Sequence, residues 1–240
     1  MKQITGYKAG FYERFIKRLF DIGISVAALI ILSPLALLCM AAIKLDDIHG
    51  SVFFKHARNG RNGEKFWVVK FRTMKKEACG ESVWATSETL TKVGKIIRLL
   101  SLDEIPQFIT IISGKMSFIG PRPLPLSYYE WFSETERRRF NVRPGLTGLS
   151  QVHGRANLNW DERFVLDTQY ADNISFLMDM KIFFRTFGVI LSHKDVLPDS
   201  DAVSEDFSEY RRKQLMKRKP PARTSQTIDK NVYQSERMQA

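Results

Sequence analysis

The order of apolar and polar residues divides the chain into four stretches. Residues 1–21 mix basic with aromatic and aliphatic positions at helical spacing, which predicts a basic amphipathic segment. Residues 22–43 carry no charged side chain at all. Residues 44–198 show the mixed periodicities of a folded domain, and from 199 to 240 the apolar period fades. We therefore expect one domain at 44–198, a hydrophobic segment before it and a basic, disordered tail after it.

The uncharged run at 22–43 is long enough to meet a membrane. As a straight helix it would extend about 33 Å, against a hydrocarbon core of about 30 Å. Ser33-Pro34 lies at its middle, where the proline removes a backbone hydrogen bond and its ring meets the carbonyl of Ile30, so the helix must kink or break. The Ser33 hydroxyl can bond the carbonyl that the proline leaves free. A signal peptide is disfavoured, because no cleavage site follows the run.

Basic residues stand on both sides of this run. Before it lie Lys2, Lys8, Arg14, Lys17 and Arg18, and residues 44–76 hold nine further Lys/Arg. A spanning helix normally has an asymmetric distribution of basic residues, so this symmetry favours a re-entrant hairpin, broken at Ser33-Pro34, with both ends in the cytoplasm. A single kinked spanning helix is the alternative.

The patterns of residues 44–198 predict a helix-rich α+β domain. Asn-Gly pairs between residues 52–55 and 65–71 favour a tight β-hairpin. Gly/Pro-rich loops are expected at 113–126 and 143–154. Helical periodicity is present at 91–100, 103–112, 127–139, 160–171 and 175–191.

Composition excludes several classes of protein. The 37 Lys+Arg against 26 Asp+Glu give a net charge of +11, but these residues divide between the flanks of the apolar run and the tail, and no nucleic-acid recognition module is visible. Two cysteines and four scattered histidines give neither a disulfide scaffold nor a zinc pattern. The P-loop, nucleophile-elbow and dinucleotide motifs are absent as well, which disfavours the usual hydrolase, NTPase and nicotinamide chemistries.

Three loop clusters place cations beside glycine or proline. They are Lys70-Phe71-Arg72-Thr73-Met74, Gly120-Pro121-Arg122-Pro123 and Arg143-Pro144-Gly145-Leu146-Thr147-Gly148. Guanidinium groups on rigid loops match phosphate oxygens, so a phosphorylated ligand is expected.

Adjacent carboxylates occur at Asp103-Glu104, within Ser101-Leu102-Asp103-Glu104-Ile105-Pro106-Gln107. Ser-x-x-Glu describes a capping box, in which Ser101 and Glu104 only cap a helix, and the local sequence favours this interpretation. Alternatively, Arg98 keeps one carboxylate ionised, so that it can attack phosphorus or hold Mg²⁺.

Taken in order, these motifs resemble one known family. Lys17-Arg18-Leu19-Phe20-Asp21 before the apolar run, Ser33-Pro34 within it, the three basic clusters and the Asp-Glu pair match the bacterial sugar transferases called monotopic phosphoglycosyl transferases, over roughly residues 14–192. The resemblance outweighs the preference for a mere helix cap at Ser101.

The resemblance implies transfer of a sugar-1-phosphate from a UDP-sugar to a polyprenyl phosphate such as undecaprenyl phosphate, which begins a lipid-linked glycan. Asp103 then takes the role of the nucleophile that forms a covalent phosphosugar, Glu104 is its partner, and Mg²⁺ lies at Asp103 on the diphosphate. Phosphate or nucleotide contacts are expected from a set of basic residues, namely Lys70, Arg72, Arg98, Arg122 and Arg143. The implied fold is a re-entrant membrane helix with a small catalytic domain and interfacial amphipathic helices.

The same resemblance places the chain on the cytoplasmic face of a bacterial inner membrane. Its expected partners are the UDP-sugar, the polyprenyl phosphate, membrane lipids, other glycan-assembly enzymes and a second copy of the chain, but no nucleic acid. The alternative from another functional class is a basic, membrane-anchored scaffold protein without chemistry of its own. Hexose and N-acetylhexosamine donors are not distinguished by the sequence.

Overall fold

The structure of the chain is a computed structural model that describes residues 6–75, 88–154, 158–191 and 206–218. It divides into two compact units, residues 1–204 and 205–240. The first unit is helix-rich and carries two small sheets, which confirms the predicted α+β class. In the second unit the structure describes helix α8 (Phe207–Arg218), so the prediction of disorder is wrong for those residues, and the rest of 199–240 lies outside the described residues.

The first unit alternates helices of different lengths with short strands. In chain order it contains η1 Tyr12–Ile16, α1 Lys17–Asp46, β1 Phe53–Asn59, η2 Arg61–Gly63, β2 Lys65–Phe71, α2 Lys92–Leu99, η4 Leu102–Glu104, α3 Gln107–Ile112, β3 Ser117–Ile119, η5 Leu126–Trp131, α4 Glu134–Arg137, η6 Arg138–Asn141, β4 Gly145–Thr147, α5 Leu149–His153, α6 Trp160–Asp172 and α7 Phe176–Leu191.

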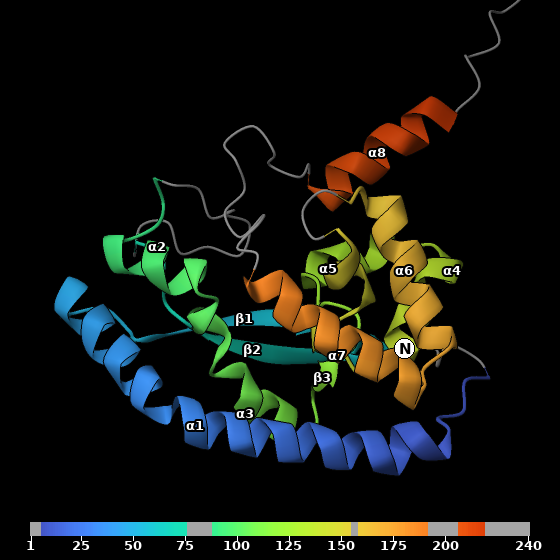
Figure 1. The fold of residues 1–240 in the computed structure, drawn as a ribbon. Coiled ribbons are helices and arrows are strands. Elements are labelled where there is room, and N and C mark those ends of the chain that lie inside the picture. Colours follow the sequence, from blue (N-terminus) through green and yellow to red (C-terminus); the bar gives the residue numbers. More distant parts are fainter. Residues whose placement is uncertain (1–5, 76–87, 155–157, 192–205, 219–240) are drawn as a thin grey trace, which may run out of the picture. The chain divides into compact units, whose positions relative to one another are not determined.

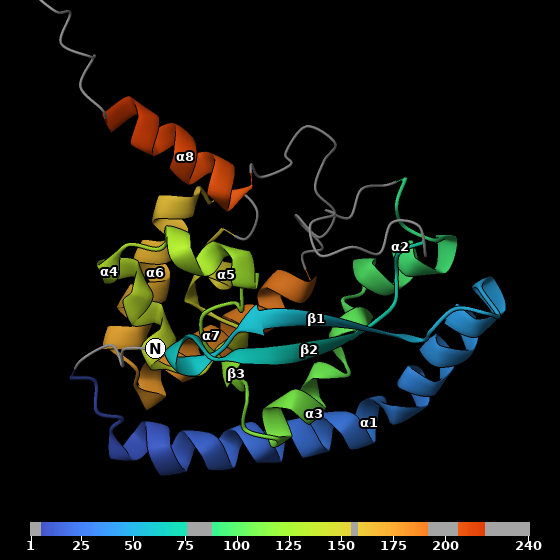
Figure 2. The same cartoon turned by 180° about the vertical axis from the view of Figure 1, so that it is seen from behind.

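Helix α1 runs along one edge of this unit, and α2, α3 and the β1–β2 sheet all lie on the same side of it (Figures 1 and 2). Pro34 stands inside the helix, which continues through it, so the predicted break into two separate helices is not present. Figure 1 instead shows α1 curving along its length. The Ser33 hydroxyl donates a hydrogen bond to the Ile30 carbonyl at 2.8 Å and so satisfies the group that Pro34 cannot bond. This contact confirms the role predicted for Ser33.

The outer surface of α1 is apolar and exposed. The helical stretch Tyr12–Asp46 is long and apolar enough to cross a membrane, with a mean hydropathy of 2.7 in its most apolar 18-residue window, and only 11% of that window is buried. A core helix of a globular domain would bury most of such a window. Exposed side chains of this surface include Leu19, Ile30, Ile31, Leu37 and Leu38.

Polar contacts hold the beginning of α1 to the rest of the unit. Each joins a charged side chain of the helix to an element far along the chain. They are Lys17 Nζ to Asp179 Oδ2 at 2.9 Å, Arg18 to the carbonyls of Ile111 and Ile112 at 2.6 Å each, and the Ser117 hydroxyl and the Phe118 amide to Asp21 Oδ1 at 2.9 Å each. Buried charges are stable only when they are paired in this way.

Strands β1 and β2 form the predicted antiparallel hairpin, in register from Phe53 opposite Phe71 to Asn59 opposite Lys65. Asn62 in the connecting turn has a φ of 57°, a conformation that asparagine tolerates well. The hydrophobic core beneath the sheet includes Phe66, Val68 and Phe71 of β2 and Cys39 and Ile43 of α1. Strand β2 and the second half of the long apolar helix therefore contribute to the same core.

Two predictions of secondary structure need correction. The segment predicted as one helix at 127–139 is divided into η5, α4 and η6, because a capping box at Ser133 and Glu136 starts a new helix within it. The predicted loops at 113–126 and 143–154 contain β3 and β4, which pair in parallel, as well as helix α5. The predicted helices at 91–100, 160–171 and 175–191 are confirmed as α2, α6 and α7.

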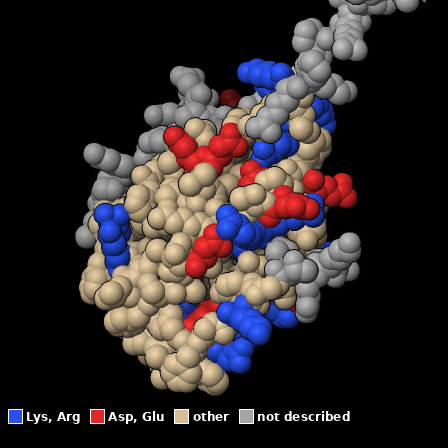
Figure 3. All heavy atoms as spheres, turned by 90° about the vertical axis from the view of Figure 1, so that its right-hand side faces the viewer, with Lys and Arg blue, Asp and Glu red and all other residues tan. Residues whose placement is uncertain are grey.

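Charges of opposite sign lie side by side on the face drawn in Figure 3. Around the middle of that view, Lys and Arg side chains neighbour Asp and Glu side chains. The net charge of +11 is therefore not gathered into one uninterrupted basic surface on this face.

Candidate active site

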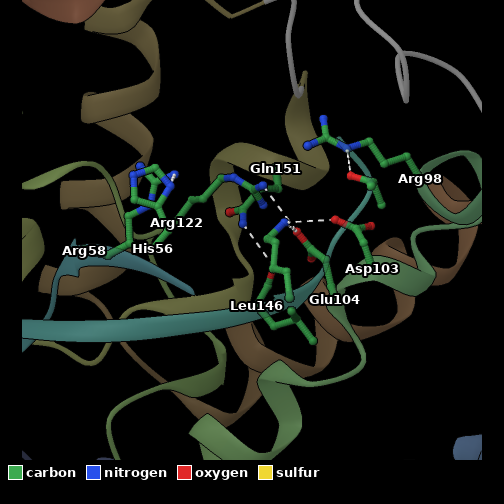
Figure 4. Close-up of polar contacts among 10 residues, drawn as sticks. His56, Arg58, Arg98, Asp103, Glu104, Arg122, Leu146 and Gln151 are labelled. Carbon is green, nitrogen blue, oxygen red and sulfur yellow. Dashed lines mark hydrogen bonds and ion pairs between the residues drawn. The ribbon is translucent and has the colours of Figure 1, made fainter. Parts of the chain in front are cut away.

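Strand β2 brings Lys70 to the two adjacent carboxylates. The Lys70 ammonium lies 2.5 Å from Glu104 Oε1 and 3.3 Å from Asp103 Oδ2 (Figure 4). The carboxylates come from η4, in the corner between α2 and α3. The lysine of the first basic cluster and the Asp-Glu pair, 33 residues apart in sequence, therefore form one site.

The conformation of Ser101 contradicts the capping-box interpretation of this segment. Ser101 is left-handed, with φ 55° and ψ 23°, and its side chain makes no capping hydrogen bond. An N-cap residue normally has an extended backbone. The left-handed residue instead turns the chain sharply after α2, and a non-glycine residue held in this conformation is typical of functional corners. The carboxylate of Glu104 is directed to Lys70 rather than back to the backbone of Ser101.

Arg122 is the second cation that contacts Glu104. Its Nη2 lies 3.3 Å from Glu104 Oε1, and 46% of its side chain is exposed. The backbone carbonyl of Arg122 accepts a hydrogen bond of 2.7 Å from Arg139. Arg139 in turn forms a buried ion pair of 2.7 Å with Asp167. A buried ion pair thus fixes the loop that carries Arg122, while the tip of its side chain stays accessible to a ligand.

Arg98, near the end of α2, lies beside Asp103 in Figure 4. Its Nε donates to the Thr73 hydroxyl at 2.8 Å, which ties it to the basic cluster that begins at Lys70. Burial lowers the pKa of the Arg98 guanidinium, and the charges of Asp103 and Glu104 act in the opposite direction. Lys70, Arg98 and Arg122 therefore surround the two carboxylates with three cations, a net positive charge suited to a phosphate group.

The electrostatics distinguish the two carboxylates. Burial opposes the ionised form of Glu104, but Lys70 and Arg122 outweigh it and lower the pKa of Glu104 to about 2. Glu104 is thus ionised at neutral pH and unsuited to donate a proton. Among the described contacts, Asp103 gives only Oδ2 to Lys70, and its Oδ1 takes part in no ion pair or hydrogen bond. In these contacts Asp103 therefore pairs with one cation, whereas Glu104 pairs with two.

Two residues predicted to bind phosphate or nucleotide lie elsewhere in the structure. Arg72 is almost completely buried, with 7% of its side chain exposed, and pairs with Asp47 at 2.6 Å. Arg143 Nε donates to the Gly114 carbonyl at 3.1 Å. Burial lowers the pKa of Arg143, and Arg61 and Arg18 contribute to that shift. The structure brings Lys70, Arg98 and Arg122 to the carboxylates, and it does not bring Arg72 or Arg143 there.

Two neighbours of the site were not predicted as members of it. Thr73 holds Arg98, and Gln151 of α5 lies beside Arg122 in Figure 4 with its Nε2 donating to the Leu146 carbonyl at 3.3 Å. Thr73 belongs to a motif that the sequence does single out, whereas a lone glutamine gives no signal. His56 and Arg58 of β1 lie on the far side of Arg122, where Arg58 donates to His56 Nδ1 at 3.0 Å.

Three glycines allow the loop of Arg122 to lie against the loop that follows Arg143. A Cβ atom at Gly120 would overlap the backbone at Arg143, and one at Gly145 or Gly148 would overlap the backbone of Gly120. The Gly120 amide donates to the Thr147 carbonyl at 2.8 Å, and the Gly145 amide donates to the Pro121 carbonyl at 3.0 Å. This close backbone contact fixes the second basic cluster beside the third.

The donor set fits one kind of magnesium site. Among the described residues no three or more His, Cys, Asp or Glu side chains converge. Mg²⁺ in phosphoryl-transfer enzymes is commonly held by one or two carboxylates together with phosphate oxygens of the substrate. Asp103, with one oxygen outside the ion pair, fits that arrangement.

Comparison with known proteins identifies the family of the chain. The sequence model of the family described as bacterial sugar transferase matches residues 12–193. The uncharacterized sugar transferase EpsL of Bacillus subtilis is 38% identical over 194 residues, which cover 80% of this chain and 96% of EpsL. The exopolysaccharide production protein ExoY of Sinorhizobium fredii is 40% identical over 192 residues, 72% of this chain and 84% of ExoY. The undecaprenyl-phosphate galactose phosphotransferase of Salmonella typhimurium is 35% identical over 197 residues, 75% of this chain and 41% of that protein. The chain belongs to the bacterial sugar transferase family.

Proposed function

We propose that this protein transfers a sugar-1-phosphate from a UDP-sugar to a polyprenyl phosphate at the membrane, and that this step begins a lipid-linked glycan. Family membership supports the reaction class, and relatives named as an undecaprenyl-phosphate galactose phosphotransferase and a UDP-galactose-lipid carrier transferase support both substrates. The exposed apolar helix supports a membrane location. The observation that carries the proposal is the Asp103-Glu104 pair enclosed by Lys70, Arg98 and Arg122.

In the first half-reaction, a carboxylate oxygen of Asp103 attacks the phosphorus that bears the sugar. The bond from this phosphorus to the bridging oxygen of the diphosphate breaks, and UMP leaves with that oxygen and its electron pair. Asp103 then carries the sugar phosphate as an acyl phosphate. Asp103 is favoured over Glu104 as the nucleophile because it pairs with one cation, Lys70 at 3.3 Å, whereas Glu104 is held by both Lys70 and Arg122.

In the second half-reaction, a phosphate oxygen of the polyprenyl phosphate attacks the same phosphorus. The acyl phosphate bond breaks, the Asp103 carboxylate is released, and the product is a polyprenyl diphosphate sugar. Storing the sugar phosphate on the enzyme means that two anionic substrates need not occupy the site together, so ping-pong kinetics are expected.

Each charged group near the two carboxylates has a distinct part in this scheme. Glu104 holds Lys70 and Arg122 in place, and the accessible Arg122 side chain binds non-reacting phosphate oxygens. Arg98, fixed by Thr73, contributes positive charge next to Asp103. Mg²⁺ held by Asp103 and the diphosphate would neutralise the charge that repels an anionic nucleophile.

The contacts of α1 support a monotopic arrangement. Lys17 and Asp21 near its beginning and Asp47 directly after its end all bond residues of the same compact unit. A polar domain bound to both ends of one helix cannot lie on both sides of a bilayer. We therefore place both ends on the cytoplasmic face of the bacterial inner membrane, with the apolar surface of α1 entering one leaflet.

The nucleophile is tested with the variant Asp103→Asn. Membranes carrying the protein are incubated with a panel of radiolabelled UDP-sugars, undecaprenyl phosphate and Mg²⁺, and labelled lipid and UMP are measured. Asp103→Asn should abolish transfer, because the amide cannot attack phosphorus, and should leave membrane association intact. The control variant Asp46→Asn removes an exposed carboxylate and should retain activity.

Near-normal turnover by Asp103→Asn would falsify the nucleophile assignment. Absence of labelled lipid and UMP with every UDP-sugar for the unmodified protein would instead support a membrane-anchored scaffold. The same panel identifies the sugar that is transferred.

A further inference from the structure

Asp47 and Arg72 form a compact junction between the end of α1 and the end of strand β2. Asp47 Oδ2 lies 2.6 Å from Arg72 Nη1, and Asp47 Oδ1 accepts the Gly50 amide at 3.0 Å. A Cβ atom at Gly50 would overlap the guanidinium, which therefore fills the space that a side chain would need. Lys44 closes the same turn by donating to the Gly50 carbonyl at 3.0 Å. The hydrogen bond from Arg72 lowers the pKa of Asp47.

Arg72 lies between two residues that serve the candidate active site. Two residues before it, Lys70 contacts both carboxylates, and the residue after it, Thr73, holds Arg98. The Arg72 amide donates to the Val52 carbonyl at 2.9 Å, which keeps the strand paired up to this point. This backbone bond does not involve Asp47, so Lys70 and Thr73 should keep their places when the ion pair is lost.

The second half of α1 depends on this junction for its direction. The first half has three charged anchors, Lys17, Arg18 and Asp21. Pro34 then interrupts the ladder of backbone hydrogen bonds and weakens the helix against bending. Beyond Pro34, Cys39 and Ile43 pack on the core without directional bonds, so Asp47 supplies the charged anchor at the far end.

We propose that Asp47 and Arg72 are positioning residues, whose ion pair holds the second half of α1 at a fixed angle to β2, so that Asp103 faces an acceptor phosphate held by the membrane. This inference rests on the proposed function. The proposed ion-pair role affects the two half-reactions differently, because the nucleotide donor arrives from water whereas the acceptor is fixed in the bilayer. Loss of the pair should leave the attack on the donor largely unchanged and should impair transfer to the membrane-bound acceptor.

The test measures the two half-reactions separately in lipid nanodiscs. The first is followed by the burst of UMP and by covalent labelling of the protein without acceptor, and the second by discharge of that label to undecaprenyl phosphate. For Asp47→Ala we expect a UMP burst within about threefold of the unmodified rate and a discharge at least about tenfold slower, since small misplacements of reacting groups carry such costs. Discharge to a short-chain, water-soluble prenyl phosphate in detergent should be nearly normal.

Two further variants complete the comparison. Asp46→Ala removes the same charge from the neighbouring, exposed position and should leave both half-reactions unchanged. Asp47→Glu keeps the charge but displaces the carboxylate by one methylene, so it should slow only the discharge, and by less than Asp47→Ala. If circular dichroism shows that Asp47→Ala does not fold, the two half-reactions are compared in Asp47→Glu instead.

Equal slowing of both half-reactions, or no effect on either, would overturn the positioning role while the proposed function stands. An unmodified protein that neither takes up label nor releases UMP would contradict the proposed function, and the positioning role with it.

Discussion

At the scale of single residues, Glu104 is held as an anion between Lys70 and Arg122, and its pKa is lowered from 4.5 to about 2. A group with a lowered pKa stabilises the folded state fully above its ordinary pKa, and this contribution is lost as the pH falls through the lowered value. The difference in unfolding free energy between the unmodified protein and Glu104→Gln should therefore be constant above about pH 5 and should shrink between about pH 4.5 and 2. Chemical unfolding of both proteins in detergent micelles at several pH values measures this difference in free energy.

The matched control for this experiment is Glu64→Gln, which changes an exposed carboxylate next to the hairpin turn. Its effect on the unfolding free energy should be small at every pH. A pH-independent effect of Glu104→Gln down to pH 2 would contradict the proposed electrostatic role of Lys70 and Arg122.

Ser101, Ser133 and Asn159 are each followed three residues later by Glu, and a comparison of the three shows when this local pattern predicts a helix cap correctly. Ser133 and Asn159 have extended backbones, and both form complete capping boxes, with Glu136 and Glu162 respectively. Ser101 has the same spacing to its glutamate but a left-handed backbone. The difference arises because Lys70 and Arg122, which are distant in sequence, take the carboxylate of Glu104. The helix cap that local sequence predicts at Ser101 is therefore wrong, and Ser101 is the one of the three positions that lies at the candidate active site.

At the scale of elements, α1 continues through Pro34 with the help of one side-chain hydrogen bond. Ser33→Ala removes the bond to the Ile30 carbonyl and should lower the unfolding free energy by about 1 kcal/mol. Pro34→Ala restores a backbone N–H that can bond the same carbonyl. In that background Ser33→Ala should therefore cost much less, and a double-mutant cycle in detergent micelles measures the coupling. Equal costs in the two backgrounds would show that Ser33 does not compensate for the proline.

Elements whose signals are local could be predicted, and those that depend on distant partners could not. The Asn-Gly turns define the β1–β2 hairpin, and the apolar period at 160–171 and 175–191 defines α6 and α7. In contrast, β3 and β4 are very short, and they pair in parallel with each other across a long stretch of intervening chain. No periodicity develops in so short a strand.

At the scale of the whole molecule, the attachment of both ends of α1 to one unit predicts its topology. A single cysteine is placed at position 2 or position 55 in a variant that lacks Cys39 and Cys79, and intact cells are treated with a membrane-impermeant maleimide. Neither cysteine should be labelled until the cells are opened, because the proposed arrangement places both flanks in the cytoplasm. Labelling of one position in intact cells would indicate a spanning helix.

The tertiary fold also decides which of the predicted phosphate-binding residues reach the site. All three basic clusters were predicted to bind phosphates or nucleotides, since each presents cations on a loop. The fold directs Lys70 and Arg122 to the carboxylates, but it directs Arg72 to Asp47 and Arg143 to the Gly114 carbonyl. The type of side chain identifies candidate phosphate-binding residues. Whether each side chain points to the carboxylates depends on its contacts with the rest of the unit.

The tight backbone contact at Gly120, Gly145 and Gly148 has a practical consequence for engineering sugar preference. Any side chain at these positions would force apart the loops that hold Arg122, so combinatorial libraries that randomise them would mostly yield inactive clones whatever donor is supplied. Residues such as Gln151, Arg58 and His56 border Arg122 without forming that contact and offer better sites for variation. A directed-evolution campaign should keep the three glycines constant and place its diversity on this border.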